Sequence, residues 1–257
     1  MKILAIGDIV GESGVKKLKE ILPKMKKEKN IDFVITNGEN SAGGMGITEK
    51  NFKNIIGAGT NVITMGNHTW GKKEIFKFID DPQLLRPANY PEGVPGTGLG
   101  IYECNGKKIA VMNFMGRVDI NILTENPFIM ASKMVNDLKD KVDIMVMDFH
   151  AEATAEKIAM ARYLDGKITI LFGTHTHVQT GDEQILPKGT AYITDLGMTG
   201  PKNSVIGMDV QASIKRFETT LPEKYKLAEG ECIFNAVIFD VDDNTNKVTD
   251  LQRILIS

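Results

Sequence analysis

The chain has 257 residues, of which 42% are hydrophobic and 25% are charged, and its formal net charge is −2. A chain of this length can bury a substantial core, and its near-neutral charge argues against sequence-independent binding to a nucleic-acid backbone, which needs a basic surface. Cys104 and Cys232 lie far apart, so neither a disulfide framework nor a thiolate metal site is indicated. No segment reaches the roughly 18 apolar residues of a membrane helix, and Asp8 comes too early for a signal peptide. We therefore expect a cytoplasmic protein without a membrane segment or an extended nucleic-acid surface.

Short apolar runs, each followed by a polar cluster, predict buried strands. These runs lie at residues 3–6, 33–35, 62–65, 109–114, 144–149, 168–172 and 191–194. Helical patterns at residues 14–29 and 48–58 separate the first three runs, with Thr48 as an N-cap of the second helix and Pro23 expected to interrupt or kink the first. This alternation indicates an α/β fold whose early strands are parallel.

The C-terminal part has a different pattern. Two strand-like runs at residues 232–241 and 248–256 flank a turn-rich segment, which predicts an antiparallel hairpin that we expect to join a second sheet. Residues 82–100 are rich in proline and glycine and are interpreted as a surface loop. No internal repeat or low-complexity segment is visible, so one domain spanning residues 1–257 is the simplest interpretation.

Residues able to bind metal follow the apolar runs. They are Asp8, Glu39, Asn40, Asn67, His68, His150, His175 and His177, and they include all four histidines of the chain. In an open α/β sheet the loops at the carboxyl ends of the strands converge on one edge, where ligands bind. Each residue alone has a structural explanation as a cap, a turn residue or a hydrogen-bonded histidine. Together they favour a site for Mn, Fe, Zn or similar ions, with more ligands than one metal would use.

The order of these residues resembles the signature of the calcineurin-like metallophosphoesterases. The matching segments are Gly7-Asp8, Gly38-Glu39-Asn40, Gly66-Asn67-His68, Asp148-Phe149-His150 and Gly173-Thr174-His175-Thr176-His177. Most of that superfamily has a histidine two residues after the first aspartate and an aspartate as the bridging carboxylate, whereas this chain has Val10 and Glu39. Both departures are similar to the bacterial YmdB-like branch, as are residues 38–44 and 194–200. That branch is known for 2′,3′-cyclic-nucleotide phosphodiesterases, and the resemblance covers essentially the whole chain.

The resemblance implies a four-layer α/β/β/α sandwich with two mixed sheets. It also implies two metal ions per chain, with iron or manganese favoured over zinc or magnesium. Asp8, Glu39, Asn40 and His177 would hold the first ion, and Glu39, Asn67, His150 and His175 would hold the second. Glu39 would bridge the two ions, and Asn40 would replace the ligand that is missing at Val10.

The implied activity is hydrolysis of 2′,3′-cyclic nucleotides or other small phosphodiesters. A hydroxide that bridges the two metals would attack phosphorus, and His68 would act as general acid. A phosphomonoesterase or nuclease with the same metal core is one alternative, and a regulatory metal-binding protein with weak incidental activity is another. No motif determines which ester oxygen leaves. The resemblance is also compatible with a homo-oligomer, a dimer or larger.

Three further residues are candidates for substrate contacts. Arg117 carries a guanidinium group suited to bidentate phosphate recognition, although a surface salt bridge explains it slightly better. Gly43 and Gly44 would let the backbone approach a substrate, but a loop with positive φ would need the same residues. Asp195, at another strand end, is a candidate to orient a ligand or a loop rather than to bind metal.

Overall fold

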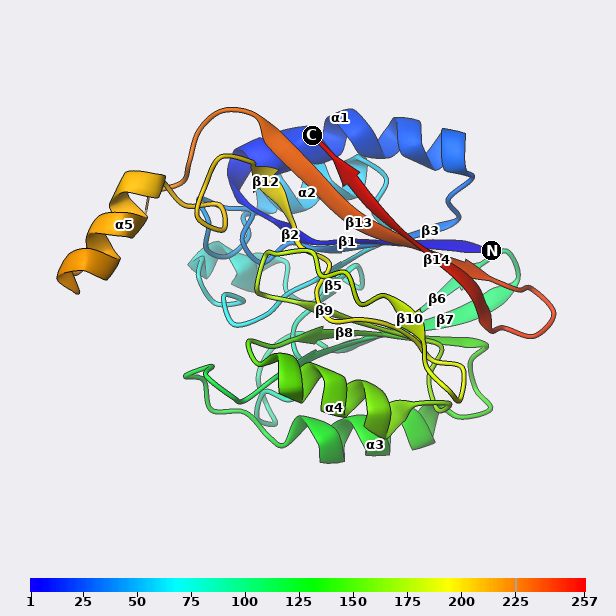
Figure 1. Ribbon diagram of the computed structural model, residues 1–257. Helices are drawn as coiled ribbons and strands as arrows, with labels where there is room; N and C mark the ends of the chain where they lie inside the picture. Colours follow the sequence, from blue (N-terminus) through cyan, green and yellow to red (C-terminus); the bar gives the residue numbers. More distant parts are fainter. Residues whose placement is uncertain (225) are drawn as a thin grey trace.

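The computed structural model describes residues 1–224 and 226–257. Its elements form four layers, with two helices above, two sheets in the middle and two helices below (Figure 1). This arrangement confirms the predicted α/β/β/α sandwich with two mixed sheets. Within the described residues, no helix has the length and apolar content needed to cross a membrane.

The first sheet has eight strands in the order β2-β12-β13-β1-β3-β4-β5, with β14 paired to β13. Its strands are β1 (Lys2–Ile6), β2 (Asp8–Ile9), β3 (Phe33–Asn37), β4 (Val62–Thr64), β5 (Leu84–Leu85), β12 (Met198–Pro201), β13 (Cys232–Val241) and β14 (Val248–Ile256). The neighbours β1, β3, β4 and β5 are parallel, as the sequence predicts, whereas β13 is antiparallel to both β1 and β14.

The second sheet has six strands in the order β10-β11-β9-β8-β7-β6. They are β6 (Leu99–Cys104), β7 (Lys107–Met115), β8 (Ile144–His150), β9 (Ile170–Thr174), β10 (Gln184–Ile185) and β11 (Ala191–Ile193). The four inner strands are parallel, and β6 and β10 run antiparallel at the two edges.

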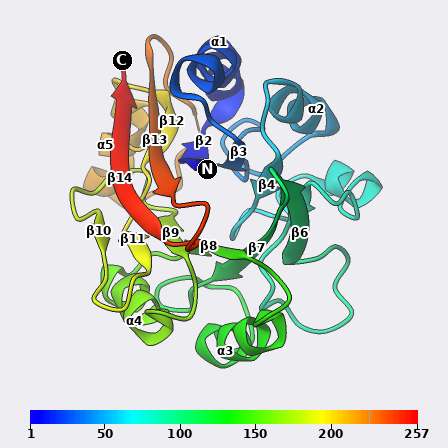
Figure 2. The ribbon, with the colours of Figure 1, turned by 90° about the vertical axis from the view of Figure 1, so that its right-hand side faces the viewer.

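Helices cover the outer faces of both sheets (Figure 2). Helices α1 (Gly11–Lys29) and α2 (Glu49–Gly57) pack on the first sheet, and α3 (Pro127–Leu138) and α4 (Thr154–Leu164) pack on the second. The short 3-10 helix η1 (Lys73–Lys77) follows β4. Helix α5 (Val210–Thr219) projects from the body of the molecule and has no buried residue (Figure 1). Thr48 caps α2 as predicted, because its side chain accepts a hydrogen bond from the Asn51 amide.

The core follows from the alternation of side chains along the strands. In β1, Ile3 and Ala5 face the second sheet, whereas Leu4 and Ile6 face the helices that cover the first. All four side chains are at most 1% exposed. Complete burial of an aliphatic side chain stabilises a fold by about 1.5–3 kcal/mol. Because both faces of β1 are buried, all its residues from Ile3 to Ile6 are apolar. The strand therefore appears in the sequence as the continuous apolar run before Gly7 and Asp8.

Three sequence-based expectations about this architecture are wrong in part. The C-terminal hairpin forms, but β13 lies beside β1 in the first sheet, where Ala5 pairs with Val237. Most of β13 is buried because layers cover both its faces, as befits an inner strand. Residues 82–100 are not entirely a surface loop, since Leu84 and Leu85 are fully buried in β5. Finally, α1 continues through Pro23, whose position on the exposed face leaves the carbonyl of the previous turn open to water.

Candidate metal centre

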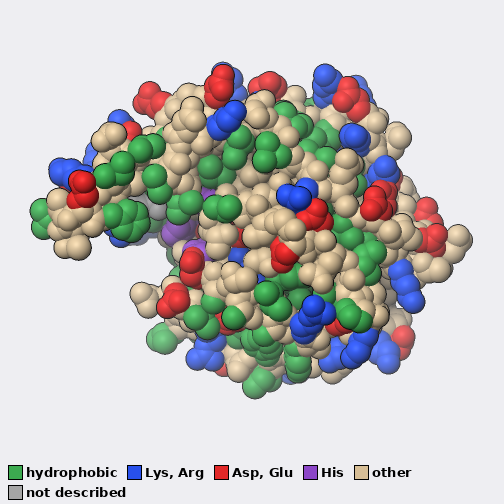
Figure 3. Space-filling view, in the orientation of Figure 1, with side chains coloured by type: hydrophobic (Ala, Val, Ile, Leu, Met, Phe, Trp, Pro, Cys, Tyr) green, Lys and Arg blue, Asp and Glu red, His purple; other side chains and the backbone are tan. Residues whose placement is uncertain are grey.

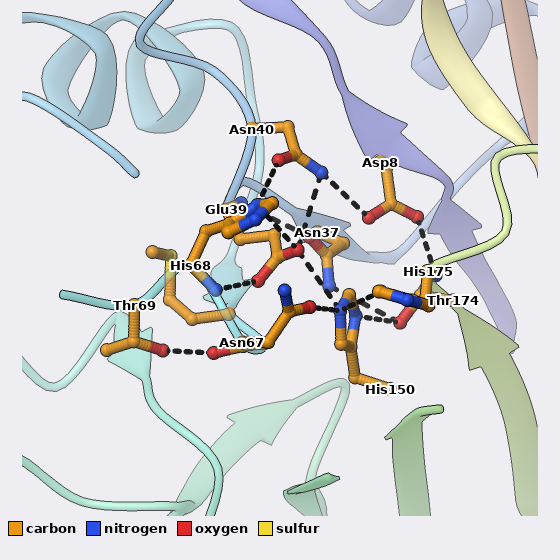
Figure 4. A network of polar contacts seen from close by, with 12 residues as sticks. Asp8, Asn37, Glu39, Asn40, Asn67, His68, Thr69, His150, Thr174 and His175 are labelled. Atoms are coloured by element: carbon orange, nitrogen blue, oxygen red, sulfur yellow. Dashed lines mark hydrogen bonds and ion pairs between the residues drawn. The ribbon is translucent and has the colours of Figure 1, made fainter. Parts of the chain in front are cut away.

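Seven of the eight residues predicted to bind metal lie together in Figure 4, where strands of both sheets end. The eighth, His177, lies beside Asp8 and Asn40. The first sheet supplies Asp8, Glu39, Asn40, Asn67 and His68, and the second supplies His150, His175 and His177. Histidine side chains are visible in a hollow of the surface near α5 (Figure 3). The cavity at this point has a volume of about 180 Å³, and its lining includes Glu39, Asn40, His68, His175 and His177.

One group of ligand atoms surrounds the imidazole of His150. Its Nε2 lies 3.1 Å from Glu39 Oε1, 2.8 Å from Asn67 Oδ1 and 3.0 Å from His175 Nδ1. Potential ligand atoms of Glu39, His150 and His175 all lie within 4.8 Å of one another. The four side chains assigned by resemblance to the second metal therefore do converge. Gly66 makes this possible, because a Cβ there would lie 2.3 Å from His150 Nε2 and 2.5 Å from Glu39 Oε2.

A second group lies on the other side of Glu39. His177 Nε2 is 3.6 Å from Asp8 Oδ1 and 3.0 Å from Asn40 Nδ2. The Asn40 nitrogen is also 3.4 Å from Glu39 Oε1 and 3.5 Å from Asp8 Oδ1. The four side chains assigned to the first metal are thus brought together, and Glu39 Oε1 contacts both groups.

His68 lies at the edge of this arrangement, with a quarter of its side chain exposed. Its backbone amide donates to Glu39 Oε2 at 2.9 Å, and its Nδ1 lies 2.7 Å from Asn40 Oδ1. The Asn40 amide therefore joins His68 to the first ligand group, with its nitrogen toward His177. A 180° rotation of the amide would exchange the positions of its nitrogen and oxygen.

The cluster contains two carboxylates, and neighbouring groups of the same chain balance their negative charge. Asp8 and Glu39 are both fully buried, and within residues 1–224 and 226–257 neither forms an ion pair with lysine or arginine. Burial raises the pKa of Asp8, but the hydrogen bond and charge of His177 outweigh it, so the net pKa is lowered. Burial likewise opposes ionisation of Glu39, and the nearby His150 lowers its pKa overall. The neighbouring imidazoles of His177 and His150 thus favour the ionised form of the two buried carboxylates.

The two histidines of the His175-Thr176-His177 segment have opposite pKa shifts. Burial and the charge of His150 lower the pKa of His175 to about 3, so its ring is neutral at pH 7. Burial also opposes the charge of His177, but the hydrogen bond and charge of Asp8 raise its pKa to about 9. Two buried carboxylates, an amide and a neutral imidazole suit a divalent cation of hard or borderline character, which would take over the balancing role of His177. The residues present therefore fit the metals that the resemblance implies.

A buried ion pair, which the sequence reasoning missed, holds the His175-Thr176-His177 segment. His175 and His177 both have positive φ, 104° and 64°. Between them, the Thr176 amide donates to Asp195 Oδ2 at 3.0 Å, and the same oxygen accepts from Lys157 Nζ at 2.7 Å. Asp195 thus orients a loop, as proposed from its strand-end position. Lys157 was detectable, because it shares the apolar face of α4 with Ala161 and Leu164, where a lysine needs a buried partner.

Two other partners of the candidate ligand histidines were missed. Thr174 Oγ1 lies 2.9 Å from His150 Nδ1 and donates to Asp148 Oδ1 at 2.7 Å. Glu152 Oε2 lies 3.0 Å from His175 Nε2. Such contacts hold an imidazole ring in one orientation and tautomer. Asp148 and Thr174 were within the quoted motifs, but only the fold shows that their side chains meet.

The predicted substrate contacts are only partly brought to the cavity. Gly44 lines it, with φ of 82°, whereas Gly43 does not, although its φ of 64° also favours glycine. Arg117 is exposed and does not line the cavity, and its backbone amide donates to Glu156. Val10, Ile206 and Met208 line it instead and form an apolar wall that was not predicted.

The four layers and this set of strand-end carboxylates, amides and imidazoles define a metallophosphoesterase of the calcineurin-like class. Within that class, the model of the YmdB-like protein family matches residues 4–254, and the chain belongs to this family.

Three relatives illustrate the similarity. A Bacillus subtilis (strain 168) protein named 2′,3′-cyclic-nucleotide 2′-phosphodiesterase is 50% identical over 258 residues, covering 100% of this chain and 97% of the relative. The crystal structure of a hypothetical protein from Thermus thermophilus has a TM-score of 0.94 at 35% identity and covers 100% of this chain and 99% of its own. The crystal structure of a phosphatase from Mycoplasma pneumoniae has the same TM-score at 39% identity, with 100% and 93% covered.

Proposed function

We propose that this protein is a metal-dependent phosphodiesterase that hydrolyses 2′,3′-cyclic nucleotides at the 2′ ester bond. The observation that carries the proposal is the pair of buried carboxylates, Asp8 and Glu39, whose charge is balanced only by histidines in the described part of the chain. His68 stands beside them at the cavity. The name of the Bacillus subtilis relative, which matches along the whole chain, supports the choice of substrate and bond.

Two groups of side chains would hold the metals. We assign Asp8, Glu39, Asn40 and His177 to one ion, and Glu39, Asn67, His150 and His175 to the other. Iron or manganese suits this set of oxygen and nitrogen ligands. When bound, the ions supply Lewis-acid chemistry that polarises the phosphoryl group and activates the attacking water. Two divalent ions and two carboxylates leave a formal charge of about +2, which attracts a phosphodiester anion.

The reaction adds water to phosphorus and breaks the bond between phosphorus and the 2′ oxygen. The product is a nucleoside 3′-phosphate. The leaving 2′ oxygen needs a proton, and His68 is placed to give it. The form of His68 that can act as general acid is the imidazolium, with an N–H at both ring nitrogens: Nδ1 would donate to Asn40 Oδ1, 2.7 Å away, while Nε2 gives its proton to the leaving oxygen and the ring becomes neutral. The Asn40 amide would thereby orient the general acid from within the first ligand group.

Metal analysis combined with hydrolysis assays tests this proposal. Purified protein loaded with manganese or iron should contain two ions per chain and should hydrolyse 2′,3′-cyclic AMP faster than 3′,5′-cyclic AMP or an aryl phosphodiester. Chromatography of the product should identify the 3′-monophosphate. Fewer than two ions per chain, or no hydrolysis of any of these substrates, would refute the proposal.

A pair of glutamate variants supplies the control. Glu39→Gln removes the shared carboxylate and should reduce the metal content below one ion per chain. Glu103→Gln makes the same chemical change at an exposed position on β6 and should retain both ions. Equal metal contents in the two variants would show that Glu39 is not a ligand.

A further inference from the structure

Ile206 occupies a strained position beside the metal centre. Val205 and Met208 exchange two backbone hydrogen bonds, each 2.9 Å long, so Ile206 and Gly207 are the central residues of a tight turn. Both have positive φ, 49° and 99°. Turns of this kind prefer Asn-Gly, and a β-branched residue with positive φ is unusual. Stability of the turn therefore does not account for isoleucine at this position.

The backbone of Ile206 has a role that any residue would fill. Its carbonyl oxygen accepts a hydrogen bond from His177 Nδ1 at 2.8 Å, which directs His177 Nε2 toward Asp8. Asparagine or glycine at residue 206 would supply the same carbonyl with less strain. The aliphatic side chain of Ile206 must therefore be explained by something other than the orientation of His177.

The Ile206 side chain is 47% exposed and lines the cavity together with Val10 and Met208. The turn is seated against Val10, because a Cβ on Gly207 would lie 2.6 Å from Val10 Cγ1. These three residues form the apolar wall of a cavity whose remaining lining carries the acidic and imidazole groups. A substrate with a charged end and an apolar end would match this division.

We infer that Ile206, with Met208, contacts the base of the cyclic nucleotide and determines the preference of the site for nucleotides over phosphodiesters without a base. This inference rests on the proposed function. With the phosphate at the carboxylate and imidazole groups, the flat face of a base has an apolar partner in the wall beside His177. Burial of both apolar surfaces then compensates for the strain and exposure of Ile206 in the free protein.

Steady-state kinetics of two Ile206 variants test the inference. Ile206→Gly and Ile206→Asn both suit positive φ and keep the carbonyl, so His177 should stay in place and the metal content should not change. We expect the KM for 2′,3′-cyclic AMP to rise about 3- to 10-fold, with kcat changed less than about 2-fold. The KM for ribose 2′,3′-cyclic phosphate, which has no base, should change less than about 2-fold. Both variants should melt at or above the wild-type temperature.

Ile101→Asn is the matched control, because Ile101 on β6 is 52% exposed and does not line the cavity. Its kinetic constants should equal those of the wild type. Unchanged KM for cyclic AMP in both Ile206 variants, or equal increases for the nucleotide and the base-free substrate, would overturn the inference. Failure of the wild-type protein to hydrolyse either substrate would instead refute the proposed function, and the inference with it.

Discussion

Lys157 and Asp195 form an ion pair of 2.7 Å in which neither side chain is exposed to solvent. The Asp195 carboxylate also accepts hydrogen bonds from the backbone amides of Thr176 and Gly197. The pair therefore joins α4 to the loop that carries His175 and His177. An isolated buried charge is costly, so each partner depends on the other.

Removal of one partner should destabilise the protein strongly. Lys157→Met leaves the Asp195 carboxylate buried without its cation, and we expect a loss of about 3–5 kcal/mol in the free energy of unfolding, measured with urea. The double variant Lys157→Met/Asp195→Asn removes both charges and should lose less than the sum of the two single variants. Additive losses would show that the two groups are not coupled.

A methyl group added at Gly66 should weaken metal binding. The new Cβ of Gly66→Ala would collide with His150 and Glu39, and we expect metal affinity to fall by about 100-fold, as measured by competition with a chelator. Gly57→Ala is the control, because no atom lies within 4 Å of its added Cβ at the end of α2. It should raise stability by about 0.5 kcal/mol and retain both metals.

The contact between Thr174 and His150 should tune metal affinity. Thr174→Val keeps the shape of the side chain but removes the hydroxyl between His150 Nδ1 and Asp148, so metal affinity should drop by about 10- to 100-fold. Thr199→Val is the matched variant, because the Thr199 hydroxyl is buried without a hydrogen-bond partner among the described residues. If both variants bind metal equally well, the Thr174 hydroxyl does not orient His150.

His68 should be required for proton transfer but not for metal binding. His68→Ala should keep two ions per chain and lose about 10²- to 10⁴-fold in turnover of 2′,3′-cyclic AMP. An aryl phosphodiester with a nitrophenolate leaving group needs no protonation, so its hydrolysis should be impaired far less. Equal losses with both substrates would assign His68 to binding instead.

The metal-free protein should lose stability as pH rises from about 6.5 to about 9. The pKa of His177 is raised to about 9, so its protonated form stabilises the fold below the ordinary histidine pKa of 6.5, and this contribution disappears as pH rises through 9. His150, whose pKa is also raised, adds to the same loss. Melting temperatures of chelator-treated protein across this pH range measure the effect.

Two glutamine variants separate the sources of this pH dependence. His177→Gln should reduce the fall in melting temperature. His175→Gln should not, because the pKa of His175 is lowered to about 3: the folded residue is neutral in this range, and loss of the proton from the unfolded residue near pH 6.5 makes stability rise with pH rather than fall. The same fall in His177→Gln as in the wild-type protein would contradict the assignment.

Local patterns predicted the α/β class and the strand-end cluster, because each buried strand is a continuous apolar run and each candidate ligand follows one, whereas the four layers were implied by the family resemblance. The sheet that β13 joins was not predictable in this way, since pairing between Ala5 and Val237 links residues far apart in the chain. The strand formed by Leu84 and Leu85 is too short to show periodicity. These failures concern long-range pairing rather than local preference.

The residues that support the cluster were harder to predict than the candidate ligands themselves. The helical pattern marks Lys157 as a buried lysine, but only the folded structure shows that its partner is Asp195. Ile206 was undetectable, because its importance comes from a backbone conformation that isoleucine normally avoids. Sequence spacing shows which groups have the required chemistry, whereas contacts between distant segments decide their geometry.

The division of the cluster between the two sheets has a consequence for how activity should be interpreted. The carboxylates and amides follow strands of one sheet, and three of the four imidazoles follow strands of the other. Neither sheet alone carries the complete set of proposed ligands. Loss of activity would therefore also indicate that the two sheets no longer pack against each other in their native arrangement. Variants that weaken the packing between the two sheets should lose metal before they lose secondary structure.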